Sequence, residues 1–233
     1  MISPKTVLVY IPCHDGRFHA GCGGGLAAAC SAGLLAQYSF LNDCSDIHLA
    51  RDLMVNSFLM SPYEWLVFID SDIEFSPRDF RLLMDYPVIP DSGPGGPIII
   101  EHPNPIMASA ATKTPDGDDE IVCAEYSKKN DSGDVVRFGL GFTRIHRSVF
   151  SKLDEVKDSE SGAPLLDYFL FKGKMVTDYF LSGVMAHQYF TEDMGFFQVV
   201  RMAGITPRIE QRTHLLHTGK KQYPYSVKVE ATE

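Results

Sequence analysis

Apolar runs separated by polar turns organise the first third of the chain. Val7–Ile11 is apolar and β-branched and stops at Pro12, which predicts a strand. A run without polar residues is typical of a strand covered on both faces, as in a parallel sheet. Tyr38–Leu41 predicts a short second strand, and the wholly apolar Trp65–Ile69 predicts a third.

A helical pattern follows each of these strands. Small residues over Leu26–Ala36 predict a helix that packs close to the sheet. A second helix is expected over Ile47–Met60, with Ser45 or Asp46 as its N-cap, and Ser76-Pro77 opens a third. Three consecutive strand–helix units predict an α/β fold with a mostly parallel central sheet flanked by helices.

The rest of the chain is less regular. The segment 87–105 is rich in proline and glycine and predicts an irregular connection. Turn-rich stretches at Thr114–Glu120 and Lys128–Asp134 predict a small antiparallel hairpin region between them. The other expected elements are strands over Met107–Thr112, Val135–Ile145 and Arg208–Leu216 and helices over Arg147–Leu153 and Phe190–Ala203. No linker separates two domains, so one domain is expected.

Four glycines, Gly21, Gly23, Gly24 and Gly25, precede the first predicted helix. They invite comparison with a phosphate-binding loop, but no Gly-Lys-Ser/Thr follows and the GxGxxG spacing is not met. Close helix packing or a loop is the favoured interpretation.

Composition narrows the class of protein further. The chain has 233 residues, with 30 acidic and 21 basic side chains and a net charge of −9. This charge argues against a protein whose main function is to bind nucleic acid. No apolar run has the length of a membrane span, and the first residues carry no secretory pattern. Five cysteines without a CxxC pair indicate free thiols in a reducing compartment, so a cytoplasmic location is expected.

The strongest chemical signal is Asp70-Ser71-Asp72, directly after the strand Trp65–Ile69. Alternate residues of a strand share a face about 6.5 Å apart, and carboxylates this close repel unless a cation or proton lies between them. Oxygen ligands at the carboxyl end of a parallel strand suit Mg²⁺ or Mn²⁺, which can bridge to a diphosphate. A solvated turn is the alternative, since Asp and Ser are common turn residues.

Six motifs, taken together and in order, resemble the GT-A glycosyltransferases, in particular small family-2-like nucleotide-sugar transferases of the kind that large algal viruses encode. The motifs are Ile11-Pro12-Cys13-His14-Asp15-Gly16, Leu49-Ala50-Arg51-Asp52, Phe68-Ile69-Asp70-Ser71-Asp72-Ile73, Gly139-Leu140-Gly141-Phe142, Thr191-Glu192-Asp193 and Leu216-His217-Thr218-Gly219. The resemblance spans about 7–219 and departs from the pattern over 87–105.

This resemblance implies a GT-A (Rossmann-like) domain over 1–233, with a nucleotide-sugar half at about 1–112 and an acceptor half at about 113–233. It implies sugar transfer from a nucleoside-diphosphate sugar, with UDP as the preferred carrier, to an acceptor hydroxyl on a glycan or other molecule. The metal cofactor would be Mn²⁺ or Mg²⁺. Asp72 would bind it directly, Asp70 would lie nearer the ribose or a metal-bound water, and His217 would be the third ligand. His214 is the competing histidine.

Further roles follow from the same resemblance. Donor binding falls to Asp70 and to a set of turn, basic and small residues: Pro12, His14, Asp15, Arg51, Ser71, Gly139, Gly141 and Lys220. Pro12, His14 and Asp15 would border the base and ribose. For Arg51, the alternative is an ordinary solvated salt bridge. For Lys220, Lys221 and Tyr223, the alternative is a solvated basic tail.

The acidic pair Glu192-Asp193 begins a predicted helix, where carboxylates cap the helix and favour its dipole. In the related enzymes an acid here takes the proton of the acceptor hydroxyl, a role that falls to Asp193 with Glu192 as its rival. Two other classes stay open. One is a non-catalytic nucleotide-sugar-binding module, and the other is a phosphatase of the haloacid dehalogenase type, whose pattern Glu74 does not match.

Overall fold

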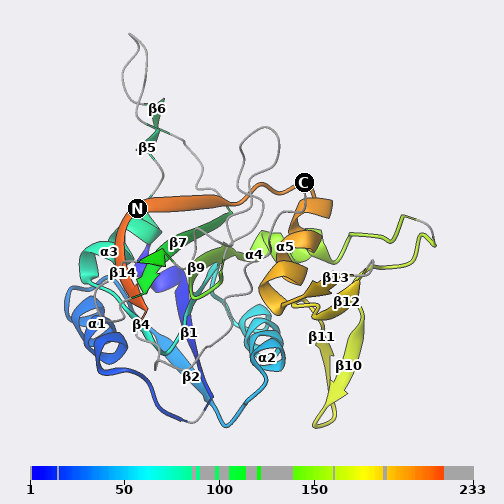
Figure 1. Ribbon diagram of the computed structural model, residues 1–233, viewed down its shortest axis with the longest axis horizontal. Helices are drawn as coiled ribbons and strands as arrows, with labels where there is room; N and C mark the ends of the chain where they lie inside the picture. The colour runs from blue at the N-terminus through cyan, green and yellow to red at the C-terminus, as the bar shows by residue number, and fades with distance from the viewer. Residues whose placement is uncertain are drawn as a thin grey trace, which may run out of the picture.

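An eight-stranded mixed sheet forms the centre of the computed structural model, which describes residues 2–14, 16–85, 88–89, 98–99, 105–113, 120–121, 139–159, 161–185 and 188–217 (Figure 1). The strand order is β2-β1-β3-β9-β7-β14-β4, and β8 pairs with β7. These strands are β1 (Val7–Cys13), β2 (Tyr38–Asn42), β3 (Trp65–Ile69), β4 (Ile73–Glu74), β7 (Ile106–Lys113), β8 (Glu120–Ile121), β9 (Phe142–His146) and β14 (Arg208–His217).

The sheet is mixed, with two groups of parallel strands separated by an antiparallel strand. β1 runs parallel to both β2 and β3, and β14 runs parallel to β7. β9 lies between these two groups and is antiparallel to β3 and to β7. Five strands therefore share one direction, while β9 and the short strands β4 and β8 run the other way.

Helices cover both faces of the sheet. They are α1 (Ala20–Ser31), α2 (Ile47–Leu59), α3 (Pro77–Met84), α4 (Arg147–Leu153) and α5 (Glu192–Met202), and a 3₁₀ turn spans Pro4–Thr6. Alternate residues of β1 enter opposite cores. Leu8 packs with residues of α2, α4 and α5, and Val9 packs with residues of α1 and α3. The two groups of helices accordingly lie on opposite sides of the sheet (Figure 1).

The glycine cluster lies inside α1, which begins at Ala20 rather than at Leu26. A Cβ at Gly21 would lie 2.4 Å from a Glu74 carboxylate oxygen, and one at Gly25 would lie 2.5 Å from the Phe75 carbonyl oxygen. The glycines therefore allow α1 to approach β4 and the chain after it, which confirms close helix packing.

Two strand boundaries differ from the sequence-based expectation. Pro12 lies inside β1, opposite Leu41 of β2, instead of ending the strand. The pairing of β1 with β3 ends at Tyr10, so no ladder hydrogen bond toward β3 is required of Pro12. β9 begins only at Phe142, and 135–138 lies outside the described residues.

Three antiparallel pairs lie off the main sheet. They are β5 (Val88–Ile89) with β6 (Ile98–Ile99), β10 (Tyr168–Phe171) with β11 (Lys174–Thr177), and β12 (Gly183–Met185) with β13 (Gln188–Phe190). The hairpin expected between 114 and 134 lies outside the described residues except for β8. No helix in the described ranges combines the length and the apolar character needed to span a bilayer.

Two adjacent glycines of α1 give opposite predictions for the same substitution. Gly25→Ala should lower the free energy of unfolding by about 1–3 kcal/mol, because its methyl group would meet the Phe75 backbone. Gly24→Ala has nothing within 4 Å and should raise it by up to about 1 kcal/mol through helix propensity. Urea unfolding of both variants measures the pair. Equal effects would contradict close packing of α1.

Candidate functional site

A pocket of about 160 Å³ lies where the carboxyl ends of β1 and β3 meet the N-terminus of α2. Parallel pairing of β1 with β3 brings these two strand ends together. The pocket is lined by Pro12, His14, Cys44, Ser45, Ile47, Asp70, Ser71 and Asp72. Five residues expected to bind donor or metal therefore line one cavity at the edge where open α/β sheets bind ligands.

Asp70-Ser71-Asp72 forms a tight turn and does not extend the strand. β3 ends at Ile69 and β4 begins at Ile73, and the Ile73 N–H donates to the Asp70 carbonyl at 3.0 Å. The two carboxylates consequently have different partners, one on α2 and one on β14. A turn separates side chains that a continuous strand would hold on one face.

Asp72 and His217 are brought together by the pairing of β4 with β14. This antiparallel pair places His217 opposite Ile73, and His217 Nε2 lies 2.8 Å from Asp72 Oδ2. Two ligands of one divalent ion with bonds of about 2.0–2.1 Å lie about 2.8–3.4 Å apart, so these atoms fit such an ion. His214 is exposed, and its backbone N–H donates to Asp79.

Arg51 connects the turn to the acidic motif at the start of α5. Its guanidinium donates to Asp70 Oδ1 at 3.0 Å and to Glu192 Oε1 at 2.5 Å, and the residue is only 3% exposed. Burial raises the pKa of Glu192, while Arg51 opposes that rise. Arg51 is thus a buried cation bound by two acids, which differs from a solvated salt bridge. Its contact with a nucleotide stays a prediction.

Asp193 is engaged mainly within its own helix. Its Oδ1 accepts a hydrogen bond from the Thr191 hydroxyl and one from the Met194 N–H at 2.8 Å. These bonds are those of a carboxylate at a helix N-terminus. The two acids of the motif therefore differ: Glu192 binds Arg51, and Asp193 accepts hydrogen bonds from Thr191 and Met194 in the first turn of α5.

Gly141 makes room for Asp70. A Cβ at position 141 would lie 2.7 Å from Asp70 Oδ2, and the Asp70 N–H donates to the Gly141 carbonyl at 2.8 Å. Gly139 accepts a hydrogen bond from the Thr143 hydroxyl at 3.4 Å. Asp15 and Lys220, as well as Lys221 and Tyr223, lie outside the described residues.

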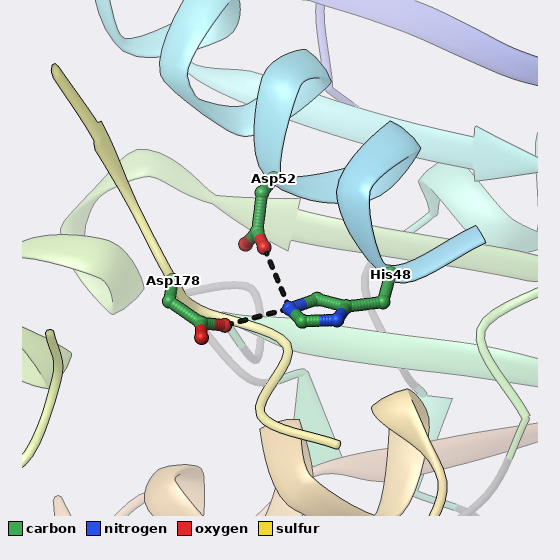
Figure 2. Close-up of side chains that lie close together, drawn as sticks. All are labelled: His48, Asp52 and Asp178. Carbon is green, nitrogen blue, oxygen red and sulfur yellow. Dashed lines mark hydrogen bonds and ion pairs between the residues drawn. The ribbon is translucent and has the colours of Figure 1, made fainter. Parts of the chain in front are cut away.

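A second cluster of His and Asp side chains lies at the N-terminal turn of α2, and the sequence analysis missed it. His48 Nε2 lies 3.1 Å from Asp52 Oδ2 and 2.8 Å from Asp178 Oδ1 (Figure 2). Within the described ranges, this is the one group of three acid, histidine or cysteine residues whose ligand atoms all lie within 4.8 Å. The spacing of His48 and Asp52, four apart on one helix face, was the signal in the sequence.

The charged groups of this cluster change one another's pKa values. The carboxylates of Asp52 and Asp178 raise the pKa of His48 to about 9, although burial acts in the opposite direction. Burial raises the pKa of Asp52 to about 6, against the effect of His48. In the metal-free protein at neutral pH, His48 is therefore an imidazolium between two carboxylates.

No protein-family model and no curated protein matches this sequence. Among solved structures, A197 from STIV superposes with a TM-score of 0.48 and 17% identity, over 92% of this chain and 86% of that chain. A glycosyltransferase involved in the glycosylation of the major capsid of PBCV-1 superposes with a TM-score of 0.32 and 11% identity, over 62% of each chain. Both TM-scores lie below 0.5, and neither similarity assigns a function to this chain.

The buried arginine predicts a large effect on stability. Arg51→Met should lower the free energy of unfolding by about 3 kcal/mol, because it leaves Asp70 and Glu192 without their cation. Adding Glu192→Gln to Arg51→Met should recover part of the loss. Chemical unfolding at pH 7 measures both variants, and a loss in Arg51→Met no larger than that of a surface ion pair would contradict this assignment.

The raised pKa of His48 predicts a pH-dependent contribution to stability. The folded-state pKa of about 9 exceeds the usual 6.5, so the contribution is fully present below pH 6.5 and is lost as the pH rises through 9. With chelator present, wild type should exceed His48→Gln in unfolding free energy by about 1–3 kcal/mol more at pH 6.5 than at pH 9.5. A constant difference across this range would contradict the assigned ion pairs.

Proposed function

We propose that this protein is a metal-dependent glycosyltransferase of GT-A type that moves a sugar from a nucleoside-diphosphate sugar, with UDP as the preferred carrier, to an acceptor hydroxyl. The observation that carries the proposal is the pocket at the carboxyl ends of β1 and β3, where Asp72 lies 2.8 Å from His217. A metal ligand pair of one carboxylate and one imidazole at this edge of a mostly parallel sheet suits a diphosphate-binding ion.

In this proposal Asp72 and His217 hold Mn²⁺, and Mg²⁺ is the alternative. Imidazole is a usual ligand for transition metals and a less usual one for Mg²⁺, which favours Mn²⁺. When bound, the ion supplies Lewis-acid neutralisation of the charge that develops on the departing diphosphate. Pro12 and His14, which also line the pocket, would contact the nucleoside.

Asp70 contributes through its fixed position. Arg51 holds its Oδ1, and the missing side chain at Gly141 leaves room for its Oδ2. A carboxylate held by Arg51 in this space presents one orientation to the ribose or to a water of the ion. Donor binding then carries no entropic cost for ordering the Asp70 side chain.

On the acceptor side, Asp193 is the proposed base and Glu192 the residue that positions Arg51. Glu192 Oε1 accepts a hydrogen bond from the guanidinium at 2.5 Å, so this oxygen is already engaged in the ion pair with Arg51. The transition state carries oxocarbenium character at the sugar, and the base accepts the proton of the attacking hydroxyl.

Asp72→Asn should weaken the Mn²⁺-dependent affinity for a UDP-sugar by roughly 100-fold, because it removes a direct ligand charge. His217→Ala should weaken this affinity by a similar factor. His214→Ala tests the competing histidine and should leave the affinity unchanged. Isothermal titration calorimetry with UDP-, GDP- and dTDP-sugars, with and without Mn²⁺, provides the measurement.

Two controls accompany these titrations. The melting temperature of the metal-free protein should stay nearly unchanged in His217→Ala, since the Asp72 side chain is 41% exposed and the pair contributes little to stability. Donor binding that needs no metal and survives Asp72→Asn would overturn the proposal. Metal-dependent binding without turnover on any acceptor would instead identify a nucleotide-sugar-binding module.

A further inference from the structure

The His48, Asp52 and Asp178 cluster joins two segments that are distant in sequence. His48 and Asp52 lie one turn apart on the same face of α2, and Asp178 follows β11. Asp52 is 0% exposed, while the side chains of His48 and Asp178 are 24% and 23% exposed. The cluster is therefore closed by protein on the Asp52 side and reaches solvent on the other.

A single proton cannot satisfy this arrangement. Two carboxylate oxygens face one imidazole nitrogen, Asp178 Oδ1 at 2.8 Å and Asp52 Oδ2 at 3.1 Å (Figure 2). Nε2 carries at most one hydrogen, and the buried Asp52 Oδ2 accepts no hydrogen bond from the residues that the structure describes.

Hydrogen bonds to other residues hold the atoms of Asp52 and His48 that do not face the centre of the cluster. Asp52 Oδ1 accepts hydrogen bonds from the Tyr179 N–H at 2.8 Å and the Phe180 N–H at 3.3 Å, which directs Oδ2 toward His48. His48 Nδ1 lies 3.1 Å from the Ser182 hydroxyl, which orients the ring. Outer partners of this kind fix the side chains of ligands in metal sites.

From this geometry we infer that His48, Asp52 and Asp178 bind a divalent transition-metal ion of the Zn²⁺ class, at a site separate from the Asp72–His217 pair. The distances of 2.8 Å and 3.1 Å lie in the range of about 2.8–3.5 Å that separates neighbouring ligands of such an ion. Imidazole nitrogen and carboxylate oxygen are both zinc ligands, and the partly exposed side leaves a position for water. The ion and neutral His48 together balance both carboxylate charges.

Such an ion would clamp α2 to the segment 178–182. Arg51 lies on the same helix, between His48 and Asp52 in sequence, and holds both Asp70 and Glu192. The second ion is thus a positioning element for the helix that carries Arg51. It does not depend on the proposed sugar transfer.

The experiment titrates chelator-treated protein with Zn²⁺ alone, in an Asp72→Asn background that disables the pocket pair. Calorimetry should find about one equivalent bound, with a rise in melting temperature. Asp178→Asn, which keeps the side-chain shape, and His48→Gln should each remove that equivalent. Glu155→Gln, an exposed acid elsewhere, is the matched control and should retain it.

Ser182→Ala provides a finer test, because it removes only the partner of the ring. It should weaken Zn²⁺ binding by about tenfold without changing the stoichiometry. The inference is overturned if the Asp72→Asn protein binds no Zn²⁺, or if Asp178→Asn and His48→Gln bind it with unchanged affinity. Because donor binding is measured separately with Asp72 intact, failure of either proposal leaves the other standing.

Discussion

The buried guanidinium of Arg51 is the charge on which the arrangement of both acidic motifs depends. It binds Asp70 after β3 and Glu192 at the start of α5, two residues that are distant in sequence. Without the guanidinium, the partly buried carboxylates of Asp70 and Glu192 would lose their cation, which is destabilising. Arg51 therefore fixes how the turn after β3 faces α5, and with it the distance between the proposed donor and acceptor sides.

Sheet topology supplies the second constraint on the site. The parallel β1 and β3 end at the same edge and open the pocket there. The antiparallel pairing of β4 with β14 then returns the chain to this edge and places His217 beside Asp72. The parallel strands form the pocket, and the antiparallel pairing brings the His217 imidazole to Asp72, 145 residues away in sequence.

Helix α2 carries charged side chains toward two different sites. Arg51 faces the turn at Asp70, and His48 with Asp52 faces the segment that contains Asp178. Arg51 lies 3.0 Å from Asp70, and His48 lies 2.8 Å from Asp178 and 3.1 Å from Asp52. The same helix also packs its apolar residues into the core, so it links the fold to both clusters of polar side chains.

The sequence by itself determined the local elements: apolar runs predicted β1 and β3, the Ser76-Pro77 pair predicted the start of α3, and Arg147–Leu153 proved to be α4. It also located Asp70-Ser71-Asp72 at the end of β3, because that signal is local, but it favoured two acids on one face over the turn that the structure has. Only the tertiary structure decided the antiparallel insertion of β9, the buried pairing of Arg51, and the meeting of His48 with Asp178. Each of these depends on contacts between distant segments, and periodicity and capping residues report only on their neighbours along the chain.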